Sequence, residues 1–141
     1  MIVSDSLMAL VLSAIVIAIV LIVLIRVTSG KHPVIDKQAY QSDWLTIKQD
    51  VDKSSPESMQ MAVIKADKLV DRAMREVGIS GSTMGERLKA RQKKWSNVNS
   101  IWSAHKLRNQ IAHEADVRLD KTVYDKAMLG FKQALKDLGA I

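Results

Sequence analysis

An almost entirely apolar run of twenty residues, from Ser6 to Ile25, lies near the N-terminus and contains no charge, glycine or proline. At a rise of about 1.5 Å per residue, a helix of this length spans roughly 30 Å, the thickness of a bilayer's hydrocarbon core. A buried helix of a small soluble protein would keep a polar face, and a cleaved signal peptide would begin with a basic segment. The pattern therefore predicts a permanent transmembrane anchor over residues 1–26, in contact with lipid through residues 6–25.

After a short polar linker at 27–33, apolar residues recur at spacings of three and four, which is the period of an amphipathic helix. One stripe covers residues 40–51, and a longer one runs from Met59 to Val77 and ends at Gly78. Ser55 is expected as the N-cap of this second helix, with Pro56 at its first position. Two further helices are expected at about 96–114 and from Asp120 onward.

A shorter helix is expected between Gly78 and the helix at about 96–114, because Thr83 and Glu86 are spaced as a capping box. No segment alternates between apolar and polar residues with a period of two, and no Asn-Gly hairpin turn is present. The sequence therefore predicts an all-α protein: a single N-terminal transmembrane helix, followed at 34–141 by a bundle of four to five helices.

The charges that flank the apolar run predict its orientation. Asp5 is the only charge before it, whereas Arg26 and Lys31 follow it closely. Because positive flanks prefer the cytoplasm, we expect the protein in the cell membrane with its N-terminus outside and its helical domain in the cytoplasm. The absence of cysteine agrees with a reducing compartment.

The net charge of +6 is concentrated in one stretch, "RLKARQKKW", which has no acidic residue. Such a patch suits nucleic-acid phosphates or anionic lipid headgroups, and a solvated helix face is the alternative interpretation. Three histidines without cysteine, at spacings unlike a zinc pattern, predict neither a metal site nor a cofactor. The candidate RNA- or lipid-binding residues are Arg87, Lys89, Arg91, Lys93 and Lys94.

The stretch "HKLRNQIAHE", from His105 to Glu114, places several polar side chains on a helix that also carries core residues. At about 100° per residue, Arg108 and His113 point roughly 140° apart, whereas Asn109 shares a face with both His105 and His113. Buried polar groups need partners, so a polar cluster on a central helix is expected to have a purpose.

The segment "RNQIAH" resembles the motif of the HEPN family, in which an arginine and an adjacent polar residue precede a histidine on a late helix of a bundle. The resemblance covers about Pro56 to Gly139, with specific residues only in the motif. It implies a HEPN-like fold, a homodimer and metal-independent cleavage of RNA. By this resemblance His113 would act as acid or base, Arg108 would hold the phosphate and Asn109 would position them.

A purely structural interpretation is open for the same residues. Arg108 would then pair with Glu114 or Asp116, Asn109 and His113 would bridge helices, and His105 would pack in the core. Three functions are compatible with the sequence, and the weakest is a sensor of the lipid surface in which residues 87–94 lie on anionic headgroups. The other two concern the whole bundle. The favoured one is a membrane-anchored interaction module that docks a cytoplasmic protein partner or helps to assemble an envelope complex. The alternative is a membrane-tethered HEPN-type endoribonuclease, acting as a toxin or defence effector. The wider sequence also looks like small membrane proteins predicted from uncultivated bacteria.

Overall fold

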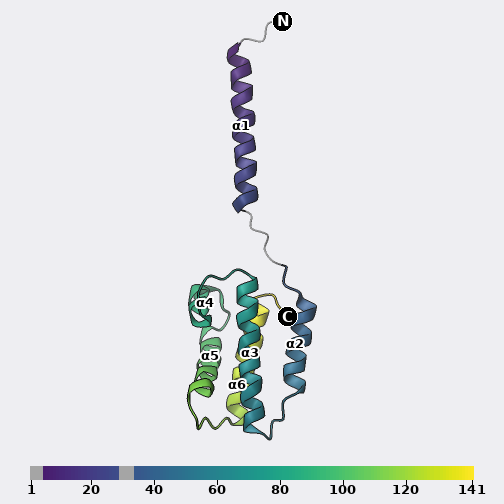
Figure 1. Ribbon diagram of the computed structural model, residues 1–141, viewed down its shortest axis with the longest axis vertical. Coiled ribbons are helices and arrows are strands. Elements are labelled where there is room, and N and C mark those ends of the chain that lie inside the picture. Colours follow the sequence, from purple (N-terminus) through teal and green to yellow (C-terminus); the bar gives the residue numbers. More distant parts are fainter. Residues whose placement is uncertain (1–4, 29–33) are drawn as a thin grey trace. The chain divides into compact units, whose positions relative to one another are not determined.

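The computed structural model describes residues 5–28 and 34–141, and in these ranges every regular element is a helix (Figure 1). The all-α prediction is therefore confirmed, with an apolar N-terminal helix followed by a packed helical bundle. The elements are α1 Asp5–Thr28, α2 Lys37–Gln49, α3 Pro56–Glu76, α4 Met84–Ala90, the short 3₁₀ helix η1 Gln92–Lys94, α5 Val98–His113 and α6 Lys121–Asp137.

Helix α1 belongs to the first of two units, Met1–His32, and the bundle forms the second, Pro33–Ile141. Within Asp5–Val27, an 18-residue window has a mean hydropathy of 3.4 and none of that window is buried, so the helix is long and apolar enough to cross a membrane. A signal sequence has the same features. The linker expected at 27–33 begins inside α1, and its remainder, 29–33, lies outside the described residues.

Side-chain caps fix where the helices of the bundle begin. In each case an oxygen of the cap accepts a hydrogen bond from a backbone N–H three residues later, which satisfies a donor that the first turn leaves free. The sequence-based expectations for Ser55, Thr83 and Asp120 are confirmed. Two more caps of the same kind, Asp36 and Asn97, start α2 and α5.

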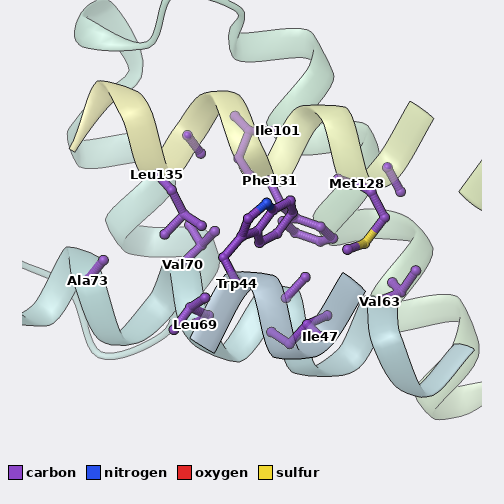
Figure 2. Packing of buried hydrophobic residues seen from close by; sticks show 14 of the residues in the cluster. Trp44, Ile47, Val63, Leu69, Val70, Ala73, Ile101, Met128, Phe131 and Leu135 are labelled. Atoms are coloured by element: carbon purple, nitrogen blue, oxygen red, sulfur yellow. The ribbon is translucent and has the colours of Figure 1, made fainter. Parts of the chain in front are cut away.

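The core of the bundle lies where α2, α3, α5 and α6 meet (Figure 2). Figure 2 shows that each of these helices contributes a large apolar side chain: Trp44 from α2, Val70 from α3, Ile101 from α5 and Phe131 from α6. Phe131 and Val70 are fully buried. Helix α4 and η1 cover one end of this core through Leu88 and Trp95, whose Nε1 donates to the Leu88 carbonyl oxygen at 3.0 Å.

The contact between α5 and α6 is very close at one point. A Cβ atom added to Gly130 of α6 would lie 2.8 Å from both the backbone oxygen and the hydroxyl oxygen of Ser100. Real Cβ atoms do not approach an oxygen so closely, so the two helices could not pack at this distance with a larger residue there. Glycine at 130 therefore sets the separation of α5 and α6, and through it the position of the motif-bearing helix.

Candidate functional site

A buried carboxylate on α3 organises the polar residues of the motif helix. Asp67 is only 4 % exposed, and its Oδ1 lies 2.8 Å from Nδ1 of His105. Its Oδ2 lies 3.4 Å from Nε of Arg108, which is close enough for an ion pair. That Nε atom is buried and has no hydrogen-bond partner among the described residues, so the contact with Asp67 is an attraction between charges rather than a hydrogen bond.

Asn109 closes a ring of polar contacts around Asp67. Its side-chain oxygen accepts a hydrogen bond from a terminal nitrogen of Arg108 at 3.0 Å, and its Nδ2 lies 3.3 Å from Nε2 of His105. If the Asn109 amide were flipped, its nitrogen would face the donating nitrogen of Arg108, and two donors cannot form a hydrogen bond. With the amide oriented as observed, Nε2 of His105 accepts and its Nδ1 donates to Asp67. The ring Asp67–His105–Asn109–Arg108 thus contains three close polar contacts and one ion pair, and Nε of Arg108 is its one buried side-chain nitrogen without a hydrogen bond within the described part of the chain.

A second acid, one turn further along α3, binds α4 in the same way. Asp71 accepts two hydrogen bonds from Arg87 through one carboxylate oxygen, at 2.9 Å from Nε and 2.6 Å from a terminal nitrogen. Arg87 is itself buried and also donates to the carbonyl oxygen of Gly81. Arg75 lies 3.5 Å from the other oxygen of Asp71. The acids Asp67 and Asp71 therefore fasten α5 and α4 to α3.

An open groove of about 1080 Å³ lies on the surface of the bundle. The four residues of the ring around Asp67 line part of it, together with Asp71 and Arg75. Its apolar wall includes Ile47, Met84 and Trp102, and the rings of Trp102 and His105 form a T-shaped pair with their centroids 6.3 Å apart. Two lysines of α3 line it as well, Lys65 and Lys68, and both are exposed and form no ion pair within the described residues.

Arg72 of α3 lies on the side of the groove that faces α2 and binds two residues of that helix. It donates from Nε to the Tyr40 hydroxyl at 3.1 Å and from a terminal nitrogen to Asp43 at 2.7 Å, and its guanidinium stacks on the Tyr40 ring. The hydrogen bonds to Tyr40 and Asp43 raise the pKa of Arg72. Burial raises the pKa of Tyr40 despite the neighbouring cation, so its hydroxyl stays protonated at neutral pH.

The three residues of the HEPN-like motif are not brought together in one chain. Arg108 and Asn109 belong to the ring around Asp67, whereas His113 is exposed at the last position of α5 and lies outside both the ring and the lining of the groove. Arg108 forms an ion pair, as the structural interpretation expected, but its partner is Asp67 and not Glu114 or Asp116. His105 packs against α3, as the structural interpretation expected.

The basic stretch from 87 to 94 does not form one uniform surface either. Arg87 is buried against Asp71 and cannot meet a ligand in this conformation. Arg91 is half-buried; it donates to the backbone oxygen of Asp137 at 2.8 Å and lies over the Trp95 ring. The remaining three residues, Lys89, Lys93 and Lys94, are exposed.

The sequence did not identify several residues of this site, among them Asp67, Asp71 and the groove lysines Lys65 and Lys68. Asp67 lies four residues after Val63 and three before Val70, within the apolar stripe of α3. An acid at such a position is expected to be buried and to need a cationic partner, and this was the available signal. Within the described residues, no group of three or more His, Asp or Glu side chains is placed to hold a metal ion.

Comparison with protein-family models, with curated proteins and with solved structures finds no match for this chain. The resemblance to the HEPN family therefore rests on the motif residues alone.

Proposed function

We propose that the protein is a single-pass membrane protein whose helical bundle docks a protein partner in the groove along α3. In this proposal α1 is retained as the anchor, the N-terminus lies outside and the bundle lies in the cytoplasm, as the basic residues after the apolar run favour. The exposed apolar surface of α1 supports a membrane location.

Some polar groups around the groove are already paired within the bundle and others are not, and this difference supports the docking proposal. Arg108 and Asn109 are held in the ring around Asp67. Lys65 and Lys68, by contrast, project from α3 without an ion pair in the described chain, beside the apolar wall that includes Trp102. An apolar wall beside two unpaired lysines suits a protein segment that carries apolar and acidic side chains.

Photo-crosslinking tests this proposal at defined positions of the full chain in its native membranes. A photoreactive residue at Thr46, which is exposed and lines the groove, is expected to capture one protein partner, and the same residue at Thr122, outside the groove, is not. Changing Lys65 and Lys68 to Glu should lower the yield at Thr46 by about tenfold, because the charge complementarity is reversed.

The matched control for charge carries Glu at Lys126 and Lys136, two exposed positions of α6 that lie outside this groove, and it should capture the partner normally. Equal capture from Thr46 and Thr122, or an unchanged yield in the Lys65 and Lys68 variant, would rule out the groove as the docking site.

A metal-independent endoribonuclease is the second candidate. One observation favours it: the arginine and the histidine of the motif both retain contact with solvent, since the Arg108 side chain is 29 % exposed and His113 is exposed. Because one chain does not bring these two residues together, the reaction would need a second copy to bring another His113 near Arg108. The two candidates differ in whether the isolated protein cleaves RNA.

A further inference from the structure

The two ends of the bundle differ in charge. At one end, here called the entry end, lie residues 34–40, where the chain enters from α1, together with 75–98 and 134–141 (Figure 1). The hydrogen bonds from Arg91 and Ser96 to Asp137 hold two of these segments together. At the opposite, far end lie residues 48–58 and 113–125, joined by the pair Lys53–Asp125 at 3.4 Å. The entry end has eight Lys and Arg against four acids, and two of the eight, Arg75 and Arg87, pair with Asp71 just outside it. The far end has four Lys and Arg against seven acids.

The acids of the entry end are engaged inside the protein. Asp36 accepts from the Ala39 N–H, Glu86 from the Ser82 N–H, and Glu76 lies 3.8 Å from Arg72. The fourth acid, Asp137, accepts two bonds from Ser96. Burial alone would raise the pKa of Asp137, but the bonds from Ser96 and Gln133 and the charge of Arg91 together lower it below its ordinary value.

Three lysines of the same end, in contrast, are unpaired. Lys89, Lys93 and Lys94 are exposed and form no ion pair within the described residues. The nearest backbone is rigid, because Trp95 is buried and Arg91 is fixed on its ring. Three free ammonium groups lie within six residues, and the neighbouring acids form their hydrogen bonds and ion pair with other groups, so the lysines form a surface for a layer of negative charge.

We propose that the entry end lies on anionic lipid headgroups of the membrane that holds α1, with Lys89, Lys93 and Lys94 as the contacting residues. Eight residues separate Thr28 from Lys37, and such a segment spans at most about 30 Å. This short tether keeps the entry end within reach of the lipid surface, where anionic headgroups attract exposed lysines. The acidic far end is repelled by the same surface.

This inference rests on the membrane anchoring in the proposed function but not on the docking groove. It is tested on the full chain in nanodiscs of neutral lipid or with about a third of anionic phosphatidylglycerol. Because the chain has no cysteine, Gln92→Cys introduces a single site for a fluorophore beside the lysines, and Thr122→Cys introduces one at the far end. Quenching by spin-labelled lipid headgroups then reports which end lies on the bilayer.

We expect stronger quenching at position 92 in anionic than in neutral nanodiscs, a loss of this difference in high salt, and no such response at position 122. The substitutions Lys89→Gln, Lys93→Gln and Lys94→Gln should each weaken the binding of the entry end to anionic lipid by about fivefold. Gln at Lys48, Lys106 and Lys126, three exposed lysines outside the entry end, is the matched control and should leave the quenching unchanged.

Three results would overturn the inference. A chain that fails to insert into nanodiscs would refute the anchor itself. A chain that inserts but shows quenching independent of lipid charge would refute only the lipid contact. If added RNA changed the signal at position 92 while lipid charge did not, the lysines would be assigned to nucleic acid instead.

Discussion

Replacing Asp67 by Ala is expected to lower the free energy of unfolding of the bundle by about 3–5 kcal/mol, the cost of removing one partner from a buried ionic cluster. The change takes away the counter-charge of Arg108 and the acceptor for Nδ1 of His105 at once. Urea unfolding in detergent micelles, followed by tryptophan fluorescence, measures the loss, because Trp44, Trp95 and Trp102 all lie in the bundle and none in α1.

Asp125→Ala is the matched control. Asp125 also contacts two cations, Lys53 and Lys121, but these pairs are exposed to solvent, so its loss should cost about 1 kcal/mol or less. If Asp67→Ala were no more destabilising than Asp125→Ala, the ring around Asp67 would not be a structural element. Its residues would then be free to serve a ligand.

Gly130→Val should destabilise the bundle by about 3 kcal/mol, because overpacking a close helix contact forces the backbone to move. The added Cβ would meet the backbone oxygen of Ser100 at 2.8 Å, and neither helix can yield without disturbing the core around Phe131. The same urea experiment measures this change.

Gly85→Ala separates the effect of crowding from that of helix propensity. Gly85 also lies within a helix, but a Cβ there would meet its nearest neighbour, Trp102, at 3.9 Å, which is an ordinary contact. Since alanine favours helix over glycine by up to about 1 kcal/mol, this variant should be as stable as the wild type or slightly more so. Comparable losses from the two changes would contradict the close contact between α5 and α6.

The helices were predictable because local chemistry specifies them. A cap at Ser55, Thr83 or Asp120 satisfies the first N–H groups of a helix whatever the rest of the chain does, and the apolar stripe of α3 follows from its spacing alone. The close approach at Gly130 was not predictable, since a glycine inside a helix gives no indication of which backbone lies opposite.

The candidate site was predictable only in part, for a similar reason. The motif helix and the packed position of His105 follow from residues within one element. The partner of Arg108 does not, because Asp67 is 41 positions away in the sequence and meets it only when α3 and α5 pack. Arg87 was assigned to an exposed basic patch for the same reason. Its partner Asp71 lies on another helix, so charge counting along the chain treats a buried ion pair as a free cation.

We infer that Arg108 and Asn109 hold the bundle together beside a docking groove rather than forming half of a nuclease site. RNA cleavage by the purified full chain in nanodiscs, with a chelator present, tests this most directly. We expect no cleavage of several unrelated RNAs by the wild type at any concentration tested, whether the chain is monomeric or dimeric in the assay. Cleavage by the wild type that is lost in a folded His113→Ala variant would contradict the claim and establish a metal-independent ribonuclease.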